Sequence, residues 1–148
     1  MSEDNWKVID ALCFFRSGIH PSFEDTHNDS GIGLYYVFEG LKEEQLDSLW
    51  NNIAAAIAGE DLCLSDKITG VRIVDKCNDY KFLFRVEFWM GEDVSASPEF
   101  DLLKNQINTL ICDSNINHFQ KPIMKPHKVD KKQDKSAQKP KEKIEMNK

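Results

Sequence analysis

Two stretches of the chain carry apolar residues at helical spacing. The first runs from Gln45 to Ala58 and ends at Gly59, and its apolar positions recur every three or four residues: Leu46, Leu49, Trp50, Ile53 and Ile57. The second follows Ser97-Pro98-Glu99, a sequence that suits a helix start because it offers an N-cap, a proline at the first helical position and an early acid. Both stretches predict amphipathic helices with one buried face.

Three further stretches are rich in β-branched and aromatic residues. Residues 31–38, GIGLYYVF, follow the turn-rich DTHNDS, and ITGVRIVDK and KFLFRVEFWM are joined by a short polar connection at residues 77–80. In the last stretch Phe84, Val86 and Phe88 alternate with Arg85, Glu87 and Trp89, which predicts a hairpin strand with one apolar face. The order strand, helix, two strands, helix predicts an α+β fold, in which helices cover one face of an antiparallel sheet.

The length and the charge distribution predict one domain followed by a tail. A chain of 148 residues with 41% hydrophobic content can bury a single core of ordinary size. From Lys121 onward ten lysines face four acids, a surplus of six, so the preceding part must carry −12 to give the net charge of −6. We therefore expect an acidic domain over residues 1–120 and a lysine-rich, disordered tail over residues 121–148, whose few apolar residues cannot offset the entropy of ordering.

Several classes of protein are disfavoured by the residues present. No apolar run approaches the roughly 20 residues that span a bilayer, and the acidic start MSEDNWKVID lacks the pattern of a secretory signal. The four cysteines lie far apart, and the four histidines show no metal-ligand spacing. No nucleophile or phosphate-loop motif is present, so we expect a cytoplasmic protein without catalytic residues, metal or cofactor.

Several landmarks along the chain resemble those of the translation initiation factor 4E family. In order they are GIHPSFED, GLYYVF, LDSLWNNIAAAIAGE, ITGVRIVDK and KFLFRVEFW, followed by a helix. The resemblance covers residues 6–111 and depends on the order and spacing of all the landmarks. It implies a curved antiparallel sheet backed by helices and a non-enzymatic role in translation initiation or its regulation, with capped mRNA as the partner and neither DNA nor membrane.

The resemblance also implies a binding site. Family members hold a guanine methylated at N7 between two tryptophans, while a glutamate reads its Watson–Crick edge. The methylated base is cationic, which favours aromatic faces and a carboxylate acceptor. Phe23 occupies the position of the second tryptophan and Glu24 that of the glutamate, while Lys76 and Lys81 match basic residues that contact the phosphates.

The chain departs from the family pattern at its amino-terminal end. The strands that precede GIHPSFED in the family, one of which bears the first sandwich tryptophan, have no counterpart here. SEDNWKVIDAL resembles a family helix, so Trp6 matches the residue that receives helical peptides of the scaffold factor 4G or of inhibitory proteins. Two alternatives stay open: a protein-interaction module of the same fold with weak or no cap binding, and an incomplete gene whose true start lies upstream.

Each candidate residue also has an ordinary interpretation. Phe23 is equally typical of a core aromatic, and Lys76 and Lys81 of solvated hairpin lysines whose stems cover apolar surface. Trp6 suits either a partner anchor or a packing residue. The motif around Phe23 and Glu24 is what favours binding.

Overall fold

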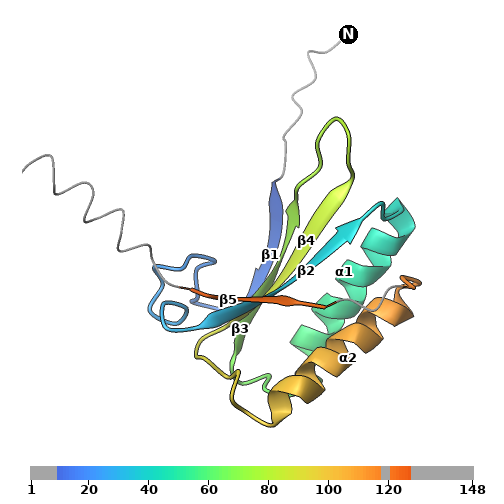
Figure 1. The fold of residues 1–148 in the computed structure, drawn as a ribbon. Helices are drawn as coiled ribbons and strands as arrows, with labels where there is room; N and C mark the ends of the chain where they lie inside the picture. Colours follow the sequence, from blue (N-terminus) through green and yellow to red (C-terminus); the bar gives the residue numbers. More distant parts are fainter. Residues whose placement is uncertain (1–9, 118–120, 128–148) are drawn as a thin grey trace, which may run out of the picture.

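The computed structural model describes residues 10–117 and 121–127. Within them the chain forms five strands and two helices, and both helices lie on the same side of the sheet (Figure 1). In chain order the elements are β1 (Ala11–Phe15), β2 (Ile32–Glu39), α1 (Glu43–Ala58), β3 (Ile68–Asp75), β4 (Leu83–Met90), α2 (Glu99–Asp113) and β5 (Ile123–Pro126). Among the helices of the described residues, none has the length and apolar character needed to cross a membrane.

The five strands form one antiparallel sheet in the order β1-β3-β4-β2-β5. The central hairpin of β3 and β4 pairs Arg72 with Glu87 and Ile73 with Val86, and β2 lies against the other side of β4. The predicted α+β class, the hairpin and both helices are confirmed. Strand β2 begins one residue later than the apolar run suggested, and α1 begins two residues earlier, at Glu43.

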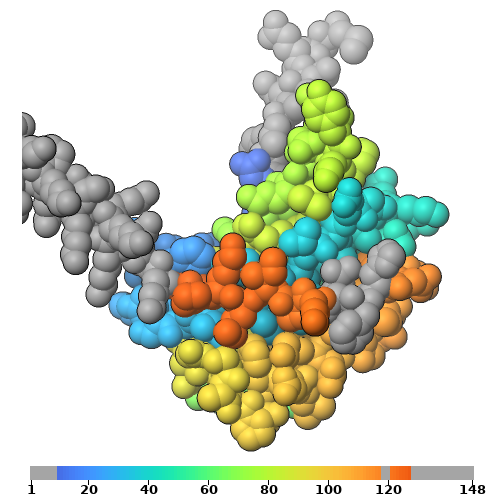
Figure 2. Space-filling view, in the orientation of Figure 1, coloured from blue at the N-terminus to red at the C-terminus, as the bar shows by residue number. Residues whose placement is uncertain are grey.

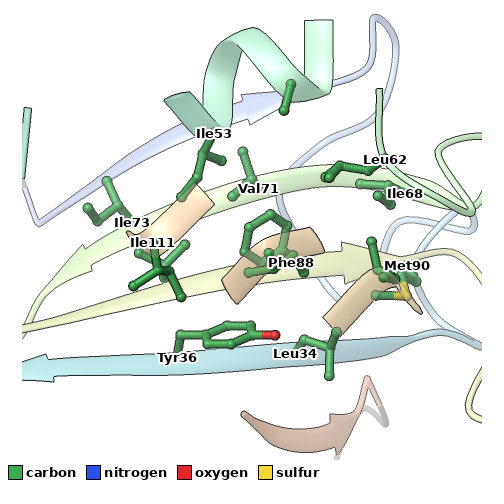
Figure 3. Packing of buried hydrophobic residues seen from close by; sticks show 14 of the residues in the cluster. Leu34, Tyr36, Ile53, Leu62, Ile68, Val71, Ile73, Phe88, Met90 and Ile111 are labelled. Carbon is green, nitrogen blue, oxygen red and sulfur yellow. The ribbon is translucent and has the colours of Figure 1, made fainter. Parts of the chain in front are cut away.

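The core lies between the helices and one face of the sheet. Alternate residues of β2 and β4, among them Tyr36 and Phe88, point toward the helices together with Val71 and Ile73 of β3 (Figure 3). The helices contribute the stripes expected from their periodicity: Leu49, Ile53 and Ala56 from α1, and Phe100, Leu103, Ile107 and Ile111 from α2. Burying these side chains supplies most of the driving force for folding.

Both edge strands were absent from the predicted set. Ala11 and Leu12 open β1 and pair with β3, although the sequence ending in these residues resembled a helix. Residues 123–126 form β5 along β2, so the ordered structure extends past residue 120, where we expected the tail to begin. An edge strand is held mainly by backbone hydrogen bonds and needs little apolar pattern, which explains why neither was visible in the sequence. The remainder of the expected tail, residues 128–148, lies outside the described residues.

Candidate nucleotide-binding site

The sheet face that the helices leave uncovered carries an unusual set of side chains. Residues paired directly across antiparallel strands share a face, and the register defines two neighbouring rows on this one. The first row contains Cys13, Arg72, Glu87, Tyr35 and Ile123; the second contains Phe15, Gly70, Trp89, Gly33 and Lys125. The first row therefore has the charged pair Arg72 and Glu87 at its middle and is called the charged row below, while the second places the large aromatic Trp89 between two glycines.

The two glycines beside Trp89 make room for other rings. A Cβ at Gly70 would lie 2.3 Å from the Phe15 ring, and one at Gly33 would lie 3.1 Å from Nε2 of His127. Phe15 meets Trp89 edge to face with ring centroids 5.2 Å apart. Side chains at either glycine would displace these neighbours, so the glycines allow the aromatic rings to gather around Trp89.

Phe23 stacks on this aromatic group from the loop between β1 and β2. Its ring centroid lies 4.6 Å from that of Trp89 and 4.9 Å from that of His127, with planes inclined by 25° and 23°. Since the Trp89 and His127 centroids are only 4.8 Å apart, both rings must lie on the same side of Phe23. Within the described residues no other ring contacts Phe23, which is half-buried, so its outer face has no aromatic partner.

His127 fixes the end of β5 against this loop. Its backbone N–H donates to Gly31 O at 2.9 Å, and its Nδ1 lies 3.1 Å from Asn28 O. The side chain is fully buried, and Nε2 has no hydrogen-bond partner within the described residues. Burial lowers the pKa of His127 below its usual 6.5, so the ring is neutral at pH 7. Figure 2 shows β5, in orange, lying across the surface with the blue loop at its left-hand end.

Hydrogen bonds from Asp25 and Asn28 hold the Phe23 loop in shape. The Asp25 carboxylate accepts bonds from the backbone N–H of His27 and of His20, both at 2.8 Å, and also contacts Nδ1 of His27. These bonds, with that from the His27 backbone the largest cause, lower the pKa of Asp25 to about 2. The buried Asn28 amide donates to His20 O and Ser22 O. These hydrogen bonds fix the conformation of the loop, and Asp25 orients the backbone next to Phe23.

Glu24 projects from the same loop into solvent. Its backbone N–H donates to Ser22 Oγ at 3.2 Å, and within the described residues its carboxylate has no hydrogen-bond or ion-pair partner. An exposed carboxylate beside a stacked aromatic ring is available to a ligand.

Glu87 lies at the centre of the charged row and is fully buried. Its Oε1 accepts bonds from Arg72 Nε at 3.0 Å and Trp89 Nε1 at 2.9 Å, and its Oε2 accepts one from Arg85 Nε at 2.6 Å. A buried carboxylate is tolerated only when paired in this way. Two arginines against one acid leave a net positive charge beside the aromatic group, and the Arg72 guanidinium carbon is 5.1 Å from the Trp89 ring centroid.

The structure places the two predicted phosphate residues away from Phe23. Lys76 directly follows β3, and Lys81 precedes β4 by two residues, so both belong to the connection at the hairpin end. Figure 1 shows this green connection at the top of the sheet and the blue Phe23 loop at its lower left. At about 3.3 Å per residue, Lys76 and Lys81 lie roughly 20 and 26 Å along their strands from the row of Trp89. Phe23 and Glu24 are thus neighbours, and the lysines are not part of their immediate surroundings.

Sequence reasoning missed most of the residues around Phe23. Trp89 was identified only as a residue of the alternating strand, and His127 fell within the expected tail. The buried Glu87 left one visible signal, a charged residue between apolar neighbours in a strand whose pattern placed it on the face without helices. Trp6 lies outside the described residues.

Known proteins resemble this chain in sequence and in fold. A sequence profile of eukaryotic initiation factor 4E matches residues 2–143. Eukaryotic translation initiation factor 4E-1 of Schizosaccharomyces pombe is 32% identical over 77 residues, which are 51% of this chain and 34% of that relative.

Solved structures share the fold at low sequence identity. C. elegans eIF4E-3, in complex with the 4E-binding protein Mextli, superposes with a TM-score of 0.59 at 22% identity, over 80% of this chain and 64% of that one. Ascaris suum eIF4E-3, in complex with m2,2,7G cap, gives 0.61 at 23% identity, over 80% and 63%. The chain therefore spans about a third of the curated relative and under two thirds of each solved chain. Because the family profile matches nearly its whole length, the chain belongs to the eukaryotic initiation factor 4E family.

Proposed function

We propose that this protein binds the N7-methylguanosine cap of mRNA in the cytoplasm and acts in translation initiation or its regulation. The observation that carries the proposal is the Phe23 ring, which is supported on one side by Trp89 and His127 and, among residues 10–117 and 121–127, has no aromatic partner on the other. Family membership supports the assignment to initiation factors, a class without catalytic activity. Ascaris suum eIF4E-3 has been solved with m2,2,7G cap, a ligand of the proposed class.

Phe23 provides one wall for the methylated base. Stacking on an aromatic ring contributes about 1–3 kcal/mol per base, and the positive charge of the methylated guanine adds about 0.5–2 kcal/mol. The rings behind Phe23 fix its orientation, which reduces the entropy lost when a base stacks on it. With a single wall we expect binding that is weak and still selective for the methylated base.

Glu24 is the residue that we assign to the guanine edge. Its carboxylate is exposed next to Phe23 and can accept bonds from N1–H and the exocyclic amine of guanine. Hydrogen bonds to a charged acceptor are about twice as strong as neutral ones, and adenine does not present this pair of donors.

The phosphates would follow the charged face of the sheet. Arg72 is a candidate for these phosphates, because its guanidinium lies 5.1 Å from the centroid of the Trp89 ring on which Phe23 stacks. Arg85 lies one row further along, and Lys76 and Lys81 lie at the hairpin end. We therefore assign the phosphates next to the base to the arginines and those further along the RNA to Lys76 and Lys81.

A fluorescence titration with nucleotides tests the proposal. The buried Trp89 directly behind Phe23 should report a base that stacks on the outer face. N7-methylguanosine triphosphate should bind more tightly than unmethylated GTP, because only the methylated base carries the charge that the ring and Glu24 favour. Equal affinity for the two nucleotides would contradict cap binding.

A second candidate function is a protein-interaction module of the same fold. It is favoured by an apolar groove of about 220 Å³ between α1 and the ends of β1 and β3, lined by Leu12, Leu46, Trp50, Ile73 and Phe84 among others. Asp10, where the described residues begin, lies on its rim, four residues after Trp6. Helical peptides of the scaffold factor 4G type or of inhibitory proteins would be the partners, and C. elegans eIF4E-3 has been solved with the 4E-binding protein Mextli. Titration with such a peptide, with and without Trp6→Ala, tests this function separately.

A further inference from the structure

Tyr80 is the most exposed aromatic side chain among the described residues. It belongs to the connection between β3 and β4, and its relative exposure is 94%. Figure 1 shows this green connection projecting beyond the ends of β2 and α1. A single exposed ring is common on protein surfaces, so its meaning depends on how the ring is held and on what surrounds it.

Hydrogen bonds fix the backbone of the turn that carries Tyr80. The side-chain Oδ1 of Asn78 accepts bonds from the N–H of Tyr80 at 2.8 Å and of Lys81 at 2.9 Å. Asn78 N–H donates to Lys81 O at 3.0 Å, and Lys76 N–H donates to Leu83 O at 2.8 Å. The antiparallel pairing of the hairpin therefore continues to Asn78 and Lys81. A ring presented by a fixed turn loses less entropy when a partner stacks on it.

A line of cations crosses the sheet face without helices and ends beside Tyr80. Arg72 of β3 and Arg85 of β4 belong to this face. Side chains an even number of residues apart along a strand share a face, and the hairpin pairing continues past the ends of both strands. Lys76, four residues after Arg72, and Lys81, four residues before Arg85, therefore lie on the same face. These four residues are called the cationic track below.

The cationic track is a positive strip on an acidic protein. The two arginines share the buried carboxylate of Glu87, whereas Lys76 and Lys81 have no ion-pair partner in the part of the chain that the structure describes. Three acids lie on the track or at its border: Glu87, Glu39 beside Leu83, and Asp79 in the turn. Four cations against three acids leave +1, on a chain whose net charge is −6.

We propose that Tyr80 stacks on a base of single-stranded RNA whose phosphates follow the cationic track. Aromatic rings combined with cations that follow the backbone are the usual means of binding single strands, and stacking accepts any base. A protein partner is less suited to this surface, because lysine is depleted at protein–protein interfaces. The inference depends on the proposed cap binding only for the direction of the RNA. A cap at Phe23 would place its 5′ end at the far end of the track, roughly 26 Å from Lys81 along the strand.

Fluorescence anisotropy with labelled RNA and the full chain tests the stacking. Single strands of about ten nucleotides suffice, because single-strand binding sites cover roughly 4–16 nucleotides. Tyr80→Ala should weaken binding of capped and uncapped strands by about 5- to 30-fold, and Tyr80→Trp should retain it. The affinity for N7-methylguanosine triphosphate should not change. Because the Tyr80 side chain is exposed, both variants should keep the parent's thermal melting curve.

Phe82→Ala is the matched control. Phe82 belongs to the same hairpin and is 69% exposed, and by alternation from Lys81 its side chain lies on the opposite face of the hairpin. Its loss should leave RNA affinity unchanged. Tyr80→Ala should also keep the slope of log K against log salt, since stacking releases no counterions.

An abasic nucleotide in the RNA identifies the stacked base without any change in the protein. The abasic site is moved along the uncapped strand one position at a time. At one or two neighbouring positions it should weaken binding to the parent about as much as Tyr80→Ala does. The same strands should bind Tyr80→Ala no more weakly than the complete strand, because the stacking partner is already absent.

The possible outcomes separate this proposal from cap binding. A loss of affinity for uncapped RNA in Tyr80→Ala, without preference for the methylated nucleotide, would support stacking and contradict cap binding. Selective binding of the methylated nucleotide, with RNA affinities that Tyr80→Ala leaves unchanged, would overturn the stacking proposal alone and would assign the exposed ring to a protein partner. Equal losses in Tyr80→Ala and Phe82→Ala, or an abasic site without effect at every position, would also overturn it.

Discussion

Phe23 lies nearly flat against Trp89, with ring centroids 4.6 Å apart and planes inclined by 25°. The two residues are far apart in sequence, and the glycines that flank Trp89 on the neighbouring strands, Gly70 and Gly33, make room for the Phe15 and His127 rings that pack with Trp89. A stack of this kind stabilises the loop and also holds a ring in a fixed orientation at the surface. The same contact therefore serves the fold and the proposed binding of a base.

Replacing Phe23 separates these two roles. Phe23→Ala should reduce cap affinity by about 1–3 kcal/mol through lost stacking, whereas Phe23→Trp should tighten binding because the outer face becomes larger. Urea unfolding should show a smaller loss for the tryptophan than for the alanine variant, since an indole can still contact Trp89. Cap affinity per folded molecule that is unchanged in both variants would make Phe23 a purely structural residue.

Glu24→Gln is the sharpest single test of guanine recognition. The amide keeps the size of the side chain, removes the charge that attracts the methylated base, and can present a donor to the guanine donors. We expect a loss of about 1.5–3 kcal/mol in cap affinity and little change in thermal stability, because the Glu24 carboxylate is exposed. Asp29→Asn, an exposed acid of the same loop, is the matched control and should bind normally. Equal losses in both variants would indicate a general effect of charge.

The sequence was sufficient to predict the parts of the fold that repeat a pattern. The stripe of Leu49 and Ile53 and the alternation of Phe84, Val86 and Phe88 follow from burying one face, so both helices and the central hairpin could be read directly. The edge strands β1 and β5 could not be predicted from the sequence, because their positions follow from backbone pairing. The residues around Phe23 could not be predicted from the sequence either. The contacts of Phe23 with Trp89 and His127 join segments that are more than 60 residues apart in the sequence, and they depend on the sheet register.

His127 should make stability depend on pH on the acidic side of neutrality. Its pKa in the folded state is lowered, chiefly by burial, while the unfolded chain takes up a proton near pH 6.5. Between the lowered pKa and 6.5 the unfolded state binds more protons, so the free energy of unfolding should fall as the pH falls through this window and stay level above it. Urea unfolding at pH 7.5 and 5.5 measures the slope, and His127→Phe should reduce it. If the free energy of unfolding depends on pH equally in His127→Phe and in the parent, other titratable groups cause the pH dependence.

The hydroxyl of Tyr36 is a site where removing an atom should stabilise the fold. It is buried in the core, and within the described residues it has no hydrogen-bond partner. A buried polar group without a partner costs about 1–3 kcal/mol, so Tyr36→Phe should raise the free energy of unfolding by a similar amount. A loss of stability on chemical unfolding would show that the hydroxyl has a partner such as a bound water.

The positions of the cations predict that different residues contact different phosphates. Lys76 and Lys81 lie at the hairpin end, whereas Arg72 and Arg85 are held near the aromatic group by Glu87. Lys76→Gln and Lys81→Gln should leave the affinity for N7-methylguanosine triphosphate unchanged and weaken binding of a capped oligonucleotide. Lys104→Gln, on α2 and paired with Asp101, is the control and should change neither.

Salt dependence identifies the contacts more directly than affinity does. Each lost contact with a single-stranded phosphate should reduce the slope of log K against log salt by about 0.7. For the capped oligonucleotide we expect this reduction in each hairpin lysine variant, and for the cap nucleotide alone we expect none.

Removing an arginine would leave the buried Glu87 without one of its partners, so Arg72→Lys and Arg85→Lys are the appropriate changes at those positions. They keep the charge but lose the planar guanidinium, and they should weaken binding of the cap nucleotide itself. If the hairpin lysine variants weaken the nucleotide as much as the oligonucleotide, Lys76 and Lys81 contact the phosphates next to the base, and the arginines serve only to pair Glu87.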